Sequence, residues 1–104
     1  LLCSSGISGK DASTGTLPPD PLRQTVLAFV NLEALLAAGG ATLGDVAKLT
    51  IYVKDNTLRD AINVEWQRCF PDPQDRPARH TLVHDLQHGM ALQLECLALI
   101  RDRA

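Results

Sequence analysis

Two charged side chains in the second half of the chain stand in settings that could serve chemistry. Glu95 lies inside a nearly continuous apolar run, where an ionised carboxylate is costly to desolvate unless a partner or a function holds it there. Burial would suit Glu95 to proton transfer, and an ion pair across a sheet or an interface is an equally good structural explanation. Arg79 follows Pro77-Ala78 at the entrance to a predicted strand, and a guanidinium binds a carboxylate through two parallel hydrogen bonds. An ordinary solvated surface arginine is the alternative for Arg79.

Three histidines, His80, His84 and His88, repeat at the four-residue spacing of a metal-ligand pair. That spacing brings two imidazoles together on a helix. The residues between the first two, Thr81-Leu82-Val83, favour a strand, along which four residues span about 13 Å. We therefore expect no metal site.

Other ligating or nucleophilic patterns are weak. Ser4-Ser5-Gly6 lacks the sequence context of a nucleophile elbow. The three cysteines are odd in number, far apart and without Cys-x-x-Cys spacing, so they predict neither a disulfide framework nor a thiolate metal cage. We interpret them as small hydrophobic residues; they are Cys3, Cys69 and Cys96.

Length and composition limit the class of protein. With 104 residues, 45% of them hydrophobic, and a net charge of -2, the chain predicts one folded domain over residues 1–104. No window approaches the roughly 20 apolar residues of a membrane span, and Leu1-Leu2-Cys3 is too short for a signal-peptide core, so we expect a cytoplasmic protein. Without net positive charge, the electrostatic basis of nonspecific nucleic-acid binding is missing, and we expect no nucleic-acid partner.

The first elements that must position these groups are a short strand, a long loop and a helix. Turn-forming residues fill positions 4–20 after the short strand. Asp20-Pro21 supplies an N-cap oxygen and a proline at the first helical position, and Gly39-Gly40 supplies the stop after Ala38. The spacing of the apolar residues predicts that the buried face of this helix carries Leu22, Val26, Phe29, Val30 and Leu36.

The remaining elements follow as a strand, a helix and two strands. Alternation over residues 46–53 predicts a strand, and Thr57 with Asp60 resembles a capping box for a second helix that runs to about Phe70. After a proline-punctuated loop, residues 81–84 and 92–100 are predicted strands joined around Gly89. The inward positions are Ala47, Leu49, Ile51 and Val53 on the strand, and Leu58, Ile62, Trp66 and Cys69 on the helix.

The last predicted strand is apolar on both of its faces. Two helices can cover one face of a sheet, so the other must be buried against something else. Self-association is the commonest way to hide such a surface, and it predicts a homo-oligomer. The alternative is a sheet that curls on itself.

Short motifs spread along the whole chain point to one family. The most specific is Arg76-Pro77-Ala78-Arg79 with Thr81, placed ahead of a glutamate-bearing final strand. The others are Ser5-Gly6, Gln24-Thr25, Asn31-Leu32, Ala38-Gly39, the runs 44–48 and 51–55, Ile62-Asn63 and the run 94–98. Together these residues resemble the RidA/YjgF family, also called the L-PSP or reactive-intermediate deaminase family.

The resemblance implies a fold and an assembly. The fold is α+β and chorismate-mutase-like (YjgF/L-PSP), with a mixed β-sheet and two helices packed on one face. The assembly is a homotrimer whose sheets form a central barrel, with clefts at the subunit interfaces. This agrees with the homo-oligomer that the last strand predicts.

The resemblance also implies roles for single residues. In deaminating members, the arginine matching Arg79 clamps the carboxylate of a 2-imino acid such as 2-iminobutyrate. The glutamate matching Glu95 orients and activates the water that attacks the C=N carbon, which gives a 2-keto acid and ammonia. Thr81 resembles the residue whose backbone carbonyl helps to hold this water, and Asn63 matches an asparagine at the cleft. The remaining substrate-binding positions are Ser5, Gly6 and His80. A protonated imine is already electrophilic, so no cofactor is required.

Three departures from the family pattern concern the pocket. Family members normally have another strand upstream of the position of Leu1, with an aromatic residue that lines the cleft. The glutamine that commonly follows Ser-Gly is Ile7 here, and the small residue after Pro-Ala-Arg is His80. Both differences change the polarity and size of the pocket rim.

Three functions are compatible with these residues. The first is hydrolytic deamination of small 2-imino or enamino acids, with Arg79 and Glu95 as catalytic residues. The second is a noncatalytic trimer that binds small carboxylates through Arg79. The third is ribonucleolytic cleavage of the L-PSP type, with His80 as the acid, but the acidic pI of about 5.8 and the few aromatic residues argue against strong RNA affinity.

Overall fold

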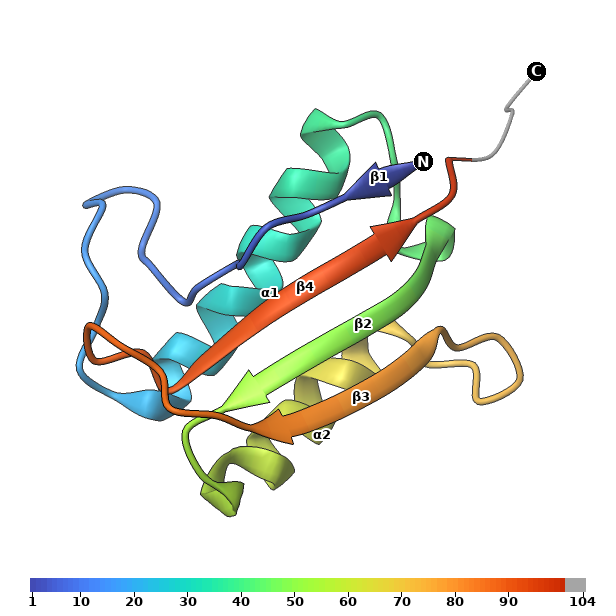
Figure 1. The fold of residues 1–104 in the computed structure, drawn as a ribbon. Coiled ribbons are helices and arrows are strands. Elements are labelled where there is room, and N and C mark those ends of the chain that lie inside the picture. Colours follow the sequence, from blue (N-terminus) through green and yellow to red (C-terminus); the bar gives the residue numbers. More distant parts are fainter. Residues whose placement is uncertain (101–104) are drawn as a thin grey trace.

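Residues 1–100, which the computed structural model of the protein describes, form a mixed four-stranded sheet with order β1-β4-β2-β3. The strands are β1 (Leu2–Cys3), β2 (Val46–Val53), β3 (Ala78–Val83) and β4 (Leu92–Ala98). β4 is antiparallel to both β1 and β2, whereas β3 is parallel to β2. The helices α1 (Pro21–Ala38) and α2 (Arg59–Cys69) lie behind one face of the sheet (Figure 1). This confirms the predicted α+β fold.

The first helix begins and ends where the sequence predicts. The Asp20 carboxylate accepts a hydrogen bond from the Leu22 amide at 3.0 Å, and Pro21 occupies the first helical position. Gly40, with φ of +79°, ends the helix in the left-handed region.

The predicted buried face of α1 was largely wrong. Phe29 and Leu36 are buried, but Leu22, Val26 and Val30 are exposed.

The inward positions include two polar residues, Gln24 and Thr25, together with Ala28 and Leu32. These polar side chains tolerate burial because they are hydrogen-bonded: the Gln24 amide nitrogen donates to the Pro18 and Gly89 carbonyls, and the Thr25 hydroxyl donates to the Pro21 carbonyl at 2.9 Å.

The second helix presents the predicted face to the core, since Leu58, Ile62, Trp66 and Cys69 are all buried. The predicted capping box was wrong. Thr57 lies in a short 3-10 helix, η2 (Asn56–Leu58), and its amide donates to the Asp55 carboxylate at 2.9 Å. Asp55, rather than Thr57, therefore caps the turn that leads into α2.

The strands differ from the sequence prediction at three places, although the bounds of β2 agree with it. In β2 a bulge between Val46 and Lys48 turns Val46 into the core and leaves Ala47 exposed. β3 begins at Ala78 instead of Thr81, because parallel pairing with β2 starts at Lys48. β4 ends at Ala98, and Leu99 and Ile100 are exposed.

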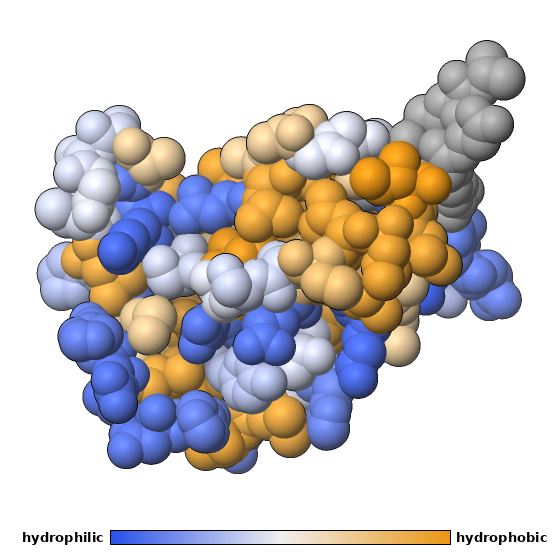
Figure 2. Space-filling view, turned by 45° about the horizontal axis from the view of Figure 1, so that its top comes forward, coloured by the Kyte–Doolittle hydropathy of each residue, from blue (hydrophilic) through white to orange (hydrophobic). Residues whose placement is uncertain are grey.

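The core fills the space between the sheet and the two helices, around Phe29, Leu49, Ile51, Ile62 and Leu94. In the described part of the chain, no helix covers the opposite face of the sheet, which we call the open face (Figure 1). Hydrophobic surface gathers where β1 begins and β4 ends (Figure 2), with Leu1, Leu97, Leu99 and Ile100 exposed. Within residues 1–100, neither helix has the length and hydropathy needed to cross a bilayer.

Candidate active site

Arg79 is held at the edge of the sheet by residues of β3 and α2. Its Nη1 donates to Asn63 Oδ1 at 2.7 Å, and its Nε donates to Thr81 Oγ1 at 3.3 Å. The guanidinium carbon lies 5.2 Å from the centroid of a Trp66 ring, within range of a cation–π interaction. Partial burial, and secondarily the positive charge of Arg59, lowers the pKa of Arg79 from its usual value. The structure therefore brings together three predicted site residues, Arg79, Thr81 and Asn63.

The local fold explains why these side chains meet. Arg79 and Thr81 are two residues apart on β3, so both face the helix side of the sheet. Asn63 and Trp66 are three residues apart on α2 and share one side of that helix. Because α2 is the crossover between parallel strands β2 and β3, it packs against the sheet beside Arg79.

Arg79 keeps hydrogen-bonding capacity that the chain does not use. One guanidinium N–H at Nη1 and one at Nε are engaged by neutral oxygens. Among residues 1–100, the only ion pairs join Arg68 to Glu33 and Glu65. A guanidinium has five N–H donors, so Arg79 has donors left for a carboxylate ligand.

Trp66 is a residue of this site that the sequence analysis assigned only to the core. Its spacing on α2 gave no sign of the arginine above its ring. Only the crossover geometry, which places β3 beside α2, brings the two together.

Glu95 lies on the other face of the sheet from Arg79. In the register of β2 with its neighbours, Leu49 is opposite Arg79, whereas Thr50 is opposite Glu95. Successive residues of a strand point to opposite faces, so Arg79 is on the helix side and Glu95 is on the open face. One copy of the chain therefore does not bring the two predicted catalytic residues together.

The expectation that Glu95 is desolvated inside an apolar strand was wrong for the single chain. Glu95 is half-buried, because its neighbours Leu94 and Cys96 point into the core while it points to the open face. The Tyr52 hydroxyl is 3.5 Å from Glu95 Oε2, a long hydrogen bond, and the Tyr52 ring meets His84 edge-on with centroids 5.7 Å apart.

His80 shares the open face with Glu95. Both residues are opposite Thr50, one on each neighbouring strand, so they lie in the same row across the sheet. His80 is exposed. Because it is on the open face, the sheet separates its side chain from that of Arg79, which faces the helices. Within residues 1–100, no group of three or more His, Cys, Asp or Glu side chains has the geometry to hold a metal ion.

Gly6 and Ser5 lie beside β4. Ile7 exchanges two backbone hydrogen bonds with Leu94, at 2.7 and 2.8 Å, which fixes this segment along the strand. A Cβ atom on Gly6 would lie 1.5 Å from the Gln93 amide nitrogen, so the absence of a side chain at Gly6 lets Gln93 pack against its backbone. The sequence analysis missed Gln93, although alternation along β4 places it on the same face as Glu95.

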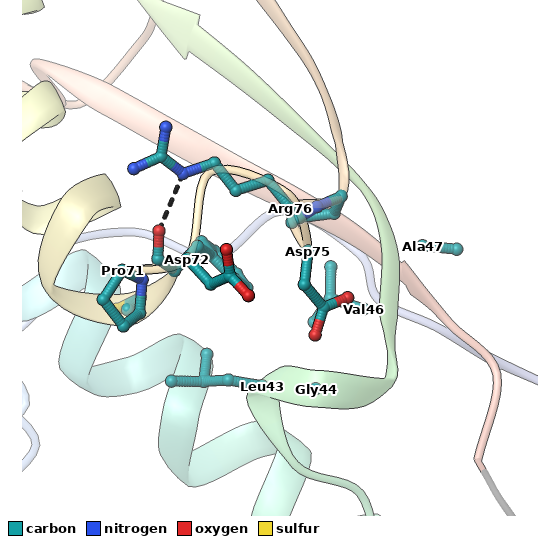
Figure 3. Close-up of a pocket in the computed structure, with 11 residues that line it drawn as sticks. Leu43, Gly44, Val46, Ala47, Pro71, Asp72, Asp75 and Arg76 are labelled. Carbon is teal, nitrogen blue, oxygen red and sulfur yellow. Dashed lines mark hydrogen bonds between the residues drawn. The ribbon is translucent and has the colours of Figure 1, made fainter.

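Two hollows lie away from Arg79. The larger, of about 370 Å³, lies between the turn that leads into β2 and the loop that follows α2, and the Asp72 and Asp75 carboxylates point into it (Figure 3). There Arg76 Nε donates to the Phe70 carbonyl at 2.8 Å. The smaller, of about 250 Å³, includes His84 and Gln93 in its lining. None of the predicted site residues lines either hollow.

The sheet topology and the arginine at its edge define an α+β domain of the YjgF/L-PSP type. The family model described as Endoribonuclease L-PSP matches residues 1–100. The chain belongs to this family, which is the RidA/YjgF family.

Individual relatives agree with this assignment. The chain is 27% identical over 103 residues to the 2-iminobutanoate/2-iminopropanoate deaminase of Escherichia coli, covering 97% of this chain and 80% of the relative. The crystal structure of RidA from Psychrobacter sp. PAMC 21119 superimposes with a TM-score of 0.86 at 26% identity, over 94% of this chain and 79% of that one. Escherichia coli TdcF with bound serine gives a TM-score of 0.83 at 27% identity, over 96% of this chain and 80% of that one.

Proposed function

We propose that the protein hydrolyses small reactive 2-imino acids to 2-keto acids and ammonia, at clefts between the subunits of a homotrimer. The observation that carries this proposal is Arg79, which is oriented by Asn63, Thr81 and Trp66 and has no carboxylate partner within residues 1–100. Support comes from relatives named as imine deaminases and from the bound serine of TdcF, an amino acid with the same α-carboxylate.

In this mechanism Arg79 binds the carboxylate of the imino acid. The guanidinium fixes the α-carbon beside β3, and the Asn63 and Thr81 contacts restrict rotation of the arginine, so little entropy is lost on binding. In the proposed site the backbone carbonyl of Thr81, on the edge strand β3, helps to hold a water molecule beside the bound imine.

The second catalytic group comes from another copy. Because Arg79 and Glu95 are on opposite faces of one sheet, a cleft containing both needs the open face of a neighbouring chain, with Glu95 of the partner subunit. The exposed apolar residues of that face, Leu82 and Leu97 among them, supply surface for such contact.

The reaction balances without a cofactor. The glutamate carboxylate takes a proton from water as the water oxygen bonds to the C=N carbon. The glutamate then returns this proton to the nitrogen, the C–N bond breaks, and the former water oxygen releases its remaining proton and becomes the keto oxygen. Ammonia leaves, and no group is oxidised or reduced.

The test uses an imino acid generated in situ by an amino-acid oxidase, with semicarbazide to trap the imine that escapes hydrolysis. We expect turnover by the wild-type protein and a severe fall in kcat/KM for Arg79→Ala, since a bidentate charge-assisted contact is worth roughly 2 to 4 kcal/mol. Arg23→Ala, an exposed arginine on α1, is the control. Full activity of Arg79→Ala would overturn the proposal, and ligand binding without turnover by an intact trimer would indicate a noncatalytic carboxylate-binding protein.

A further inference from the structure

A second arginine lies next to the Arg79 site. Arg59, Asn63 and Trp66 occur at spacings of four and three residues on α2 and therefore follow one side of that helix. Asn63 and Trp66 both contact Arg79, at 2.7 Å to its Nη1 and 5.2 Å from ring centroid to guanidinium carbon. Arg59 continues this line by one helical turn toward the start of α2.

Arg59 is held in a defined position but not neutralised. Its Nε donates to Asn56 Oδ1 at 2.9 Å, which leaves the outer nitrogens of the guanidinium for other partners. Among residues 1–100, neither Arg59 nor Arg79 has a carboxylate within ion-pair distance, whereas Arg68 on the same helix contacts both Glu33 and Glu65. The chain as a whole is acidic, with a net charge of -2.

The position of Arg59 is electrostatically unfavourable for the empty protein. It is the first residue of α2, where the positive end of the helix dipole disfavours a cation. Its positive charge also repels that of Arg79 and, after partial burial, is the second cause that lowers the pKa of Arg79. An anion with two negative groups that binds there would reduce both the unfavourable interaction of Arg59 with the helix dipole and the repulsion between Arg59 and Arg79.

Resting on the proposed function, we infer that Arg59 and Arg79 together select dicarboxylic 2-imino acids, the imines related to glutamate and aspartate. Arg79 binds the α-carboxylate, because Asn63, Thr81 and Trp66 orient it beside the reacting carbon. Arg59 binds the carboxylate of the substrate side chain. Arg59 lies one helical turn from Asn63, whose Oδ1 accepts the hydrogen bond from Arg79 Nη1, so Arg59 stands on α2 next to the residue that orients Arg79.

The experiment compares the imine made from glutamate with the imine made from a neutral amino acid of similar length, for wild type and Arg59→Gln. Each imine is generated by an oxidase that accepts the parent amino acid. We expect Arg59→Gln to lower kcat/KM for the dicarboxylic imine by about tenfold or more, mainly through KM, because one charge-assisted contact is lost. The neutral imine should change by less than about twofold. Arg23→Gln is the matched control and should affect neither substrate.

An equal fall for both imines, or no fall for either, would overturn the inference while leaving the deaminase function standing. A binding measurement separates the two proposals if turnover is absent. By titration calorimetry, 2-oxoglutarate should bind more tightly than 2-oxobutyrate to the wild-type protein, and Arg59→Gln should remove the difference. If no variant shows turnover but Arg59→Gln loses the preference for 2-oxoglutarate, the result supports the site formed by Arg59 and Arg79 and contradicts the deaminase function. Equal binding of both keto acids to the wild-type protein contradicts the site formed by Arg59 and Arg79.

Discussion

Asn63 Oδ1 accepts a hydrogen bond from Arg79 Nη1 at 2.7 Å, and this contact joins the second helix to the edge strand at the candidate active site. The bond is between an exposed amide and a half-buried cation, so it restricts the arginine without neutralising it. An orienting neutral partner leaves the charge of Arg79 for an incoming carboxylate, which a buried ion pair would not do.

Substitution of Asn63 tests this interpretation with two variants, one that truncates the side chain and one that keeps its size but adds a negative charge. Asn63→Ala should lower kcat/KM by about tenfold, since one hydrogen bond to a charged group is lost and Arg79 gains freedom. Asn63→Asp should lower it further while raising Tm slightly, because the new carboxylate pairs with Arg79 and competes with the substrate. Kinetics and thermal unfolding of both variants provide the measurement. A more active Asn63→Asp variant would contradict the assigned role of Arg79.

Glu95 is expected to act on the water and not on substrate binding. Glu95→Gln keeps the shape of the side chain and the Tyr52 contact but removes the basic carboxylate. We expect kcat to fall by roughly 100-fold or more, the usual scale of a lost general base. The affinity for 2-oxobutyrate, measured by calorimetry, should change little. A kcat within a fewfold of wild type would exclude Glu95 as the base, and the neighbouring Gln93 would then be the next residue of the open face to substitute.

The sequence identified most elements of the fold because their signals are local. The cap at Asp20-Pro21, the glycine stop and the alternation in 46–53 each act over a few residues, and all three correspond to observed features. The buried face of α1 was not predictable in this way. Gln24 is buried because its amide oxygen accepts from the Ala91 amide, 67 residues further along the chain.

The site was predictable in part for the same reason. Arg79, Thr81 and Asn63 were expected from short motifs and do meet in space. That Arg79 and Glu95 face opposite sides of the sheet depends on the register of β3 and β4 against β2, which is a tertiary property. The packing of Gln93 on Gly6 likewise depends on how residues 4–7 pair with β4.

Gln24 should be one of the larger polar contributors to stability. Its amide bonds the Pro18 carbonyl at 2.8 Å, the Gly89 carbonyl at 3.2 Å and the Ala91 amide at 2.8 Å, and the side chain is 1% exposed. Gln24→Ala leaves these buried groups unpaired, so we expect a loss of about 3 kcal/mol in the free energy of unfolding. Gln67→Ala, on the exposed side of α2, should cost less than about 0.5 kcal/mol. Urea unfolding measures both, and similar losses would contradict the assignment.

Cys69 links stability to alkaline pH. Burial, together with the nearby Glu33 carboxylate and despite the positive charge of Arg68, raises the pKa of the Cys69 thiol to about 11 from 9.0. The folded protein therefore holds this proton more tightly than the unfolded chain does, and the resulting stabilisation is complete below pH 9 and lost as the pH rises toward 11. The free energy of unfolding of the wild-type protein should fall between pH 9 and 11 by an amount on the order of 2 kcal/mol because of this thiol. We expect Cys69→Ala to lack this fall. Cys3→Ala, at an exposed position, is the control that should leave it unchanged. Identical pH profiles for wild type and Cys69→Ala between pH 8 and 11 would show that the thiol does not contribute.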